Sequence, residues 1–195
     1  MTLKHASERA RGDFETVAVA VAHNGRALRF ASEELQRNRL IVLAAVSQNG
    51  IVLEHAAPDL QVDKEIVLAA VSDEGLSLQF ASDALRDDRE VVMASVSKNG
   101  RALRFASEAL RGDLDIVLAA FRTNSSAFED AAPSLRINES TWKAVAADIS
   151  PQFVVFKITM ISGRSCFLPL DLTSNFINKN TVLELCMTHL DLSFQ

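Results

Sequence analysis

The residues best suited to chemistry in this chain are four histidines and two cysteines, and their spacing does not favour a metal site. They are His5, His23, His55, His189, Cys166 and Cys186. A zinc site needs about four such ligands close together, usually in short paired motifs. No histidine here lies three or four residues from another histidine, and Cys186 with His189 is a single pair without a second one. We therefore predict no metal site, and reduced thiols rather than a disulfide framework.

Paired carboxylates and recurring serines are the other groups that could act in catalysis. Pairs such as Glu33 with Glu34 and Asp87 with Asp88 could supply a general acid and a general base. Their recurrence just before a predicted helix start favours helix capping and solvation instead. Serines such as Ser72 lie outside any nucleophile elbow, and no glycine-rich phosphate loop is present. We predict a protein that is not an enzyme, with no catalytic residue and no cofactor.

A period of 25 residues organises the first two thirds of the chain. Glycine, valine and leucine return at this interval without a single insertion. The recurring residues include Gly25, Gly50, Gly75 and Gly100; Val17, Val42, Val67, Val92 and Val117; and Leu35, Leu60, Leu85, Leu110 and Leu135. A register that is uniformly valine is typical of a buried core, so we expect every unit to pack in the same way.

Each unit is predicted to contain two short helices. The first begins at an Asp or Asn cap such as Asp63 and continues through the apolar run Ile66–Val71. The glycine that follows is expected to end this helix in the left-handed conformation. The second helix begins just after the glycine, as in Arg101–Ala106, and we expect Pro58 and Pro133 to break or restart it in the third and sixth copies.

These elements predict a mainly α fold, an α-solenoid of short helix pairs over residues 1–148. A leucine-rich-repeat horseshoe has a similar period and would make Ile66–Val71 a buried strand. Alanine-rich segments are poor strands, and the Leu-x-Leu and Asn ladder of those repeats is missing. The helical interpretation is therefore favoured. His55 occupies the register of Phe30, Phe80 and Phe105, so we expect it to have a packing role.

The stretch Asp88–Arg111, which reads Asp-Arg-Glu-Val-Val-Met-Ala-Ser-Val-Ser-Lys-Asn-Gly-Arg-Ala-Leu-Arg-Phe-Ala-Ser-Glu-Ala-Leu-Arg, resembles the repeats of the DUF4116 family. Those tandem repeats are about 50 residues long, two of the present units, and the resemblance extends over residues 1–137. It implies a repeat array without implying an activity or a ligand. Because Leu3 is in register with Leu28, the chain opens partway through a unit, and we expect a fragment of a longer array or an incomplete gene model.

The C-terminal quarter loses this period and is predicted to form a β-hairpin followed by a helix. Phe153–Ile161 and Ser165–Leu172 are rich in strand-forming residues and flank a Ser-Gly-Arg turn, and Thr181–Leu190 has an amphipathic pattern. The segment is similar to the first hairpin and helix of a ubiquitin-like fold. We therefore expect a partial ubiquitin-like domain over residues 151–195, without the terminal Gly-Gly that conjugation requires.

Charge and hydropathy restrict the possible partners and the location. A formal net charge of -5 argues against binding to nucleic acid or to an anionic membrane surface, since both need clustered Lys and Arg. Apolar runs such as Ile66–Val71 are far shorter than the about 20 residues of a membrane-spanning helix. The N-terminus is polar, unlike a secretory signal. We expect an intracellular, cytoplasmic protein.

The remaining indication of function is that some positions of the repeat hold a different residue type in each unit. Buried positions of a solenoid stay uniform, while its exposed face differs from unit to unit and commonly binds. The most distinctive variable residues are Arg26, Arg29, Arg101 and Arg104, although an ordinary solvated surface would vary in the same way. We predict a non-catalytic scaffold for an unknown protein partner. The alternatives are a repeat protein that binds RNA or single-stranded nucleic acid, and a regulatory arm of a larger enzyme.

Overall fold

The structure, a computed structural model, describes residues 3–136, 153–159 and 165–171. By its contacts the chain divides into two units, Met1–Ala131 and Ala132–Gln195. The first unit holds the repeats, and the described part of the second holds one short helix and two strands. The boundary predicted between residues 148 and 151 lies outside the described residues.

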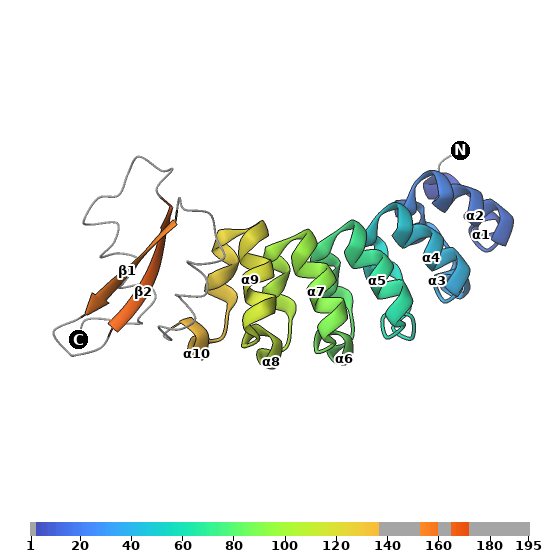
Figure 1. Ribbon diagram of the computed structural model, residues 1–195. Coiled ribbons are helices and arrows are strands. Elements are labelled where there is room, and N and C mark those ends of the chain that lie inside the picture. Colours follow the sequence, from blue (N-terminus) through green and yellow to red (C-terminus); the bar gives the residue numbers. More distant parts are fainter. Residues whose placement is uncertain (1–2, 137–152, 160–164, 172–195) are drawn as a thin grey trace, which may run out of the picture. The chain divides into compact units, whose positions relative to one another are not determined.

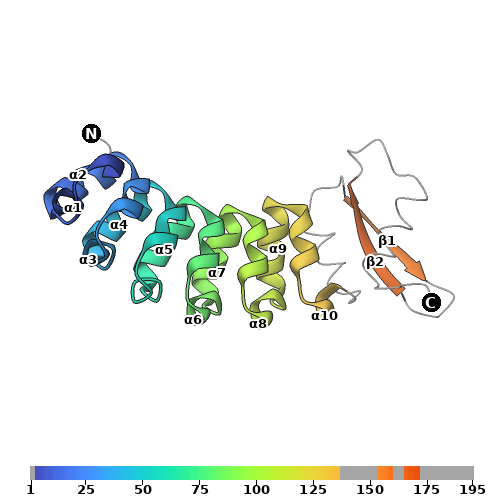
Figure 2. The same ribbon diagram turned by 180° about the vertical axis from the view of Figure 1, so that it is seen from behind.

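Ten-residue α-helices form one layer of the first unit, one in each repeat. They are α2 (Phe14–His23), α4 (Arg39–Gln48), α5 (Lys64–Asp73), α7 (Arg89–Lys98) and α9 (Leu114–Thr123). Consecutive long helices pack against each other in chain order, as Figure 1 shows from α2 in blue to α9 in yellow, and Figure 2 shows the same order from behind. The predicted mainly helical fold of repeated units is confirmed for the described residues, and the strand alternative is excluded because residues 64–73 are helical.

Each long helix is followed by a 3-10 helix rather than by a second α-helix. The 3-10 helices are η1 (Leu3–His5), η2 (Gly25–Phe30), η3 (Gly50–His55), η4 (Gly75–Phe80), η5 (Gly100–Phe105) and η6 (Ser125–Asp130). Most are followed by a single α-helical turn: α1 (Glu8–Arg11), α3 (Glu33–Gln36), α6 (Asp83–Arg86), α8 (Glu108–Arg111) and α10 (Pro133–Arg136).

The helix in the second half of the repeat is interrupted in every described copy, including those without proline. Proline is therefore not the cause of the interruption, although the sequence suggested it. After η2 the backbone becomes extended at Ala31, with φ -67° and ψ 158°. The helix then restarts at Ser32, whose hydroxyl accepts a hydrogen bond from the Leu35 amide at 3.4 Å. Ser107 caps α8 in the same way, at 3.2 Å from the Leu110 amide. Pro133 begins α10, whereas Pro58 lies in a turn.

The recurring glycines do not adopt the left-handed conformation, and that prediction was wrong. The long helix ends on an extended residue, for example Asn49 with φ -159° and ψ 103°, and the glycine opens the 3-10 helix. Close packing explains the glycine instead. A Cβ on Gly75 would lie 2.5 Å from the carbonyl oxygen of Ser95 in the next repeat, and the other three glycines meet an alanine carbonyl of the next repeat even more closely. No side chain fits at these four positions without a shift of the backbone of the next repeat.

The core of the array is the valine register together with the leucines of the 3-10 helices. Val17, Val42, Val67, Val92 and Val117 are all fully buried, which confirms the core that the period predicted. Leu28, Leu53, Leu78 and Leu103 are buried to the same extent. Each repeat therefore adds a similar apolar layer to the next, and burial of apolar surface is the main force that holds the stack.

Backbone hydrogen bonds also join successive repeats at a constant register. The amide two residues after the end of each of η2, η3, η4 and η5 donates to a carbonyl at the end of the preceding repeat. The bonds run from Ser32 to Arg11 at 2.9 Å, from Ala57 to Gln36 at 3.0 Å, from Ser82 to Gln61 at 3.1 Å and from Ser107 to Arg86 at 2.9 Å. These bonds satisfy backbone groups that would otherwise be left unpaired between helices.

A row of ion pairs, which we call the ion-pair ladder, runs across three of the interfaces between repeats. At each step the first residue of a long helix bridges two acidic residues of the next repeat. The pairs are Arg39 with Asp63 and Glu65, Lys64 with Asp88 and Glu90, and Arg89 with Asp113 and Asp115. Hydrogen bonding to Arg39 holds the pKa of Asp63 below its usual range, and hydrogen bonding to Lys64 does the same for Asp88.

The ladder aspartates are also the helix caps that the sequence predicted. One oxygen of Asp88 accepts from the amides of Glu90 and Val91 at 3.0 and 3.2 Å. The other accepts from Nζ of Lys64 in the preceding repeat at 2.8 Å. A single carboxylate therefore starts its own helix and contacts the neighbouring one.

The described part of the second unit contains an antiparallel strand pair. β1 (Phe153–Thr159) and β2 (Ser165–Asp171) pair from Phe153 opposite Asp171 to Thr159 opposite Ser165. Both strands fall within the ranges expected from the sequence. The expected turn, the expected helix Thr181–Leu190 and the features that would define a ubiquitin-like fold lie outside the described residues.

Candidate interaction face

The predicted interaction residues all lie on the 3-10 helices, and all four arginine side chains are exposed. Arg26 and Arg29 belong to η2, and Arg101 and Arg104 belong to η5. Successive 3-10 helices pack side by side, η2 on η3, η3 on η4 and η4 on η5. The arginines therefore form two separate pairs at equivalent positions of one surface, the 3-10 face, with two repeats between them.

Two of the arginines already contact neighbouring side chains. The guanidinium carbon of Arg29 lies 4.5 Å from the centre of the Phe30 ring, a favourable cation–π distance. Nε of Arg104 lies 3.5 Å from a carboxylate oxygen of Asp130. Within the described residues, no ion pair involves Arg26 or Arg101. These two guanidinium groups remain available to an acidic partner.

Between the two arginine pairs of the 3-10 face, the register of Arg26 is apolar and the register of Arg29 is acidic or polar. Ile51 on η3 and Leu76 on η4 occupy the register of Arg26 and are half-buried. The register of Arg29 holds Glu54 and Gln79 in the same two repeats, both exposed. The sequence contained these substitutions, but only the side-by-side packing of the 3-10 helices shows that they form the centre of one surface.

The last residue of most 3-10 helices is a half-buried ring, at Phe30, His55, Phe80 and Phe105. His55 has the same intermediate burial as the phenylalanines, as its register predicted. Among the described residues, no three histidine, cysteine or acidic side chains gather closely enough to hold a metal ion. Cys186 and His189 lie outside that part of the chain.

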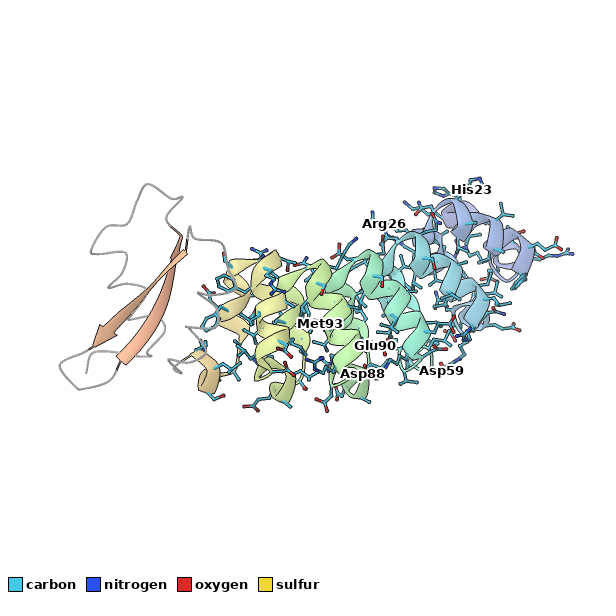
Figure 3. All side chains as sticks on the ribbon, in the orientation of Figure 1. His23, Arg26, Asp59, Asp88, Glu90 and Met93 are labelled. Atoms are coloured by element: carbon cyan, nitrogen blue, oxygen red, sulfur yellow. The ribbon has the colours of Figure 1, made fainter. Side chains whose placement is uncertain are left out.

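The charged residues are distributed unequally between the two edges of the array. Figure 3 shows Asp59, Asp88 and Glu90 at one edge, and His23 and Arg26 at the opposite edge. The acidic edge contains the N-termini of the long helices, where the helix dipole favours negative charge. The opposite edge contains their C-termini and the start of the 3-10 helices, so Arg26 lies away from the acidic row.

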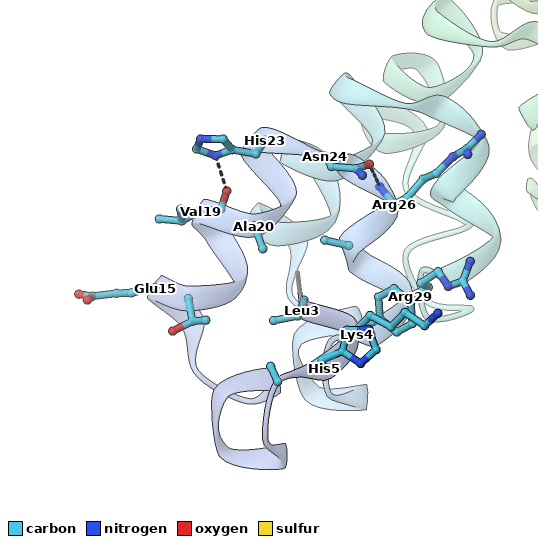
Figure 4. A pocket seen from close by; sticks show the side chains of 14 residues that line it. Leu3, Lys4, His5, Glu15, Val19, Ala20, His23, Asn24, Arg26 and Arg29 are labelled. Atoms are coloured by element: carbon cyan, nitrogen blue, oxygen red, sulfur yellow. Dashed lines mark hydrogen bonds between the residues drawn. The ribbon is translucent and has the colours of Figure 1, made fainter. Parts of the chain in front are cut away.

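A cavity of about 750 Å³ lies against α2, η1 and η2, and the sequence did not predict it. Its lining combines an apolar floor with a polar rim (Figure 4). The lining includes Thr16, Val19, Ala20 and His23 of α2, and Arg26 and Arg29 of η2. Nδ1 of His23 lies 2.9 Å from the carbonyl oxygen of Val19 in its own helix. Thr16 stands at a register that holds Ile or Val in the four later described repeats, and this is the sequence signal that marks the cavity.

Comparison with known families decides the assignment. A family model described as a domain of unknown function, DUF4116, matches residues 13–61, 63–111 and 88–136. The chain belongs to the DUF4116 family. The second and third matches begin 25 residues apart (88 − 63 = 25), so one DUF4116 match spans two of the structural repeats. No curated protein and no solved structure matches the chain.

None of the helices in the described part of this DUF4116 chain has both the length and the apolar character needed to cross a bilayer.

Proposed function

We propose that this DUF4116 array is a non-catalytic scaffold that binds a protein partner through the 3-10 face. One observation supports the proposal most directly. Residues at buried registers are nearly identical from repeat to repeat, whereas the exposed registers of the 3-10 helices change in charge and polarity. Differences confined to one surface of a uniform solenoid are typical of a binding surface.

The distribution of side chains favours a protein segment over a nucleic acid. The half-buried Ile51 and Leu76 provide apolar contact in the centre, and Arg26 and Arg101 provide positive charge at either side. A partner segment with apolar residues between two acidic ends fits this pattern, because such complementarity fixes register and speeds association. A nucleic-acid strand would require a cation in each repeat, and Glu54 interrupts the row.

The proposal can be tested by affinity capture from cells that contain the protein, followed by mass spectrometry. Three baits are compared: the full chain, Arg101→Glu/Arg104→Glu, and the control Arg9→Glu/Arg37→Glu, which reverses two exposed charges away from the 3-10 face. We expect a protein recovered with the full chain and the control to be lost from the Arg101 and Arg104 variant. Equal recovery by all three baits would contradict the proposal. Recovery of RNA that is released by moderate salt would favour nucleic-acid binding instead.

A further inference from the structure

The exposed side chains of the 3-10 face form two rows that follow the repeat. In a 3-10 helix, side chains three residues apart lie one above the other, so the registers of Arg26 and Arg29 are neighbours on every 3-10 helix. The first row holds Arg26, Ile51, Leu76 and Arg101, and the second row holds Arg29, Glu54, Gln79 and Arg104. A further 3-10 helix lies beyond each arginine pair, because η1 packs against η2 and η6 packs against η5.

A third row, of half-buried rings, lies beside the second. Its members end their 3-10 helices and are Phe30, His55, Phe80 and Phe105. In η6 the same register holds Asp130, and its carboxylate reaches Arg104 of the preceding repeat. By this equivalence, each ring lies next to the second-row side chain of the repeat before it. The face therefore offers aromatic surface at every step.

Asp130 also shows how a carboxylate binds on this face. One of its oxygens lies 3.5 Å from Nε of Arg104. The equivalent position next to Arg29 is occupied by His55 rather than by an acid. In the part of the chain that the structure describes, no ion pair involves Arg26, Arg29 or Arg101. Carboxylates of a partner can therefore bind at both ends of the two rows.

The interval between repeats selects the conformation of a bound segment. Packed helices lie about 8–10 Å apart, so equivalent side chains of successive 3-10 helices recur at about this interval. A polyproline II segment has three residues per turn and rises about 3.1 Å per residue, so every third residue lies on the same side, about 9.3 Å from the one before. In a β-strand, residues three apart point to opposite sides. An α-helix returns to the same side only after seven residues, about 10.5 Å.

We propose that the 3-10 face binds a polyproline II segment of a partner protein, about ten residues long, in which one acidic, two apolar and one acidic residue follow at intervals of three. The acidic residues meet the arginine pairs of η2 and η5, and the apolar residues meet Ile51 and Leu76. Glu54 disfavours a further acidic residue at the centre. The row of rings suits this conformation, because polyproline II segments dock in grooves lined by aromatic side chains. The inference rests on the proposed function and specifies its partner.

Two peptides of identical composition test the spacing. The probe is Asp-Pro-Pro-Leu-Pro-Pro-Leu-Pro-Pro-Asp, and the comparison peptide is Asp-Pro-Leu-Pro-Pro-Pro-Pro-Leu-Pro-Asp, which moves both leucines off the side that carries the acids. Each peptide carries a fluorophore on a Gly-Ser linker, is titrated with the full chain and is followed by anisotropy. We expect the probe to bind about tenfold or more tightly, because only its leucines face Ile51 and Leu76.

Variants of the full chain locate the binding site. Arg101→Glu/Arg104→Glu should weaken binding of the probe about tenfold or more, and added sodium chloride should weaken it in the unmodified chain. Leu76→Gln should reduce the difference between the two peptides, because it removes part of the apolar contact that separates them. Arg9→Glu/Arg37→Glu, away from the 3-10 face, is the control and should leave binding unchanged. Melting curves check that each variant is folded.

Three outcomes would overturn the inference. They are failure of the probe to bind the full chain, equal binding of the comparison peptide, and tighter binding of a helical peptide of about 22 residues that carries the same four side chains at intervals of seven. Each of these leaves the proposed function intact if the captured partner still depends on Arg101 and Arg104. Capture that does not depend on them would contradict the proposed function, and the inference with it.

Discussion

The interface between α2 and α4 has the same backbone arrangement as the three later interfaces. It differs from them in the side chains at the edge where the ion-pair ladder lies. The later interfaces each have a cation that bridges an aspartate cap and an acidic residue of the next repeat. At the first interface these positions hold Phe14, Asn38 and Leu40. Phe14 is 44% exposed and Leu40 66% exposed. All three positions change together, from charged to uncharged.

This difference shows which contacts the stack requires. The buried valines, the close approach of glycine and the backbone hydrogen bonds between repeats are present on both sides of α4. The ion pairs are present on one side only. Because exposed ion pairs contribute little to stability, an apolar pair at the same edge can replace them without changing the fold. The ladder therefore modifies an interface that packing has already established.

Substitution of the shared core should have the largest effect. Val67→Asp places a carboxylate without a partner at a fully buried position, and we expect the free energy of unfolding to fall by several kcal/mol, on the order of 3 or more. Val42→Asp at the uncharged interface should cost a similar amount. Urea denaturation followed by circular dichroism measures both. Val62→Asp, at a side chain that is 58% exposed, is the control, and near wild-type stability of Val67→Asp would show that the register is wrong.

A methyl group at the glycine register should have the next largest effect. Gly25→Ala tests the uncharged interface and Gly50→Ala a charged one, because in both the added carbon would overlap an alanine carbonyl of the next repeat. We expect each to lower the free energy of unfolding by about 1–3 kcal/mol. Gly12→Ala is the matched control, since its nearest neighbouring atom would be 3.7 Å away. A much milder effect of Gly25→Ala would show that the first interface is more loosely packed.

Transfer of the uncharged edge to a charged interface should have a smaller effect. The variant Lys64→Phe/Asp88→Asn/Glu90→Leu reproduces Phe14, Asn38 and Leu40 two interfaces further along the array, between α5 and α7. We expect it to fold, with a stability change smaller than that of Gly50→Ala, because Asn keeps the helix cap. The midpoint of urea unfolding should depend less on sodium chloride than it does for the unmodified chain, since fewer exposed charges remain to be screened. Failure to fold would show that the charged ladder is required.

The smallest expected effect is on pH dependence at acidic pH. Asp63 and Asp88 have lowered pKa values because Arg39 and Lys64 hydrogen-bond to their charged forms. The unfolded chain therefore binds protons more readily than the folded one. The stabilisation is complete above the ordinary carboxyl pKa of about 3.9 and is lost as the pH falls through the lowered folded values. Carbon-13 NMR titration of the two carboxylates should show this shift, and Lys64→Met should move Asp88 back toward its ordinary value. An unchanged titration of Asp88 in that variant would argue against the ladder.

The repeat and its buried core could be predicted from the sequence, because both depend on residue type at a fixed interval. Val67 was assigned to the core and Asp63 to a helix cap, and both assignments are confirmed. The sequence indicated that a glycine is required at Gly50, but the predicted reason, a left-handed backbone, was wrong. A glycine after a helix has two explanations, a left-handed backbone and a close approach. Only the position of the next repeat, with the carbonyl of Ala70, separates them.

The candidate surfaces were predicted less completely. The exposure of Arg26 and Arg101 followed from their variable register. The apolar centre at Ile51 and the cavity beside Thr16 did not, because both depend on which helices lie side by side. The ladder was missed for the same reason, since Arg39 meets Asp63 across 24 residues of chain. A comparison of residues one repeat apart, searching for opposite charges, would have found it.

The shared carboxylates have a consequence for how the array unfolds. Asp63, Asp88 and Asp113 each start one helix while holding a cation from the helix before. When a repeat melts, its neighbour loses a counter-ion at the same moment as it loses an apolar surface. Melting of one repeat therefore promotes melting of the next, and cooperativity passes from neighbour to neighbour as in a one-dimensional chain. The interface at Phe14 lacks this electrostatic coupling, so we expect the array to begin fraying there before its charged interior opens.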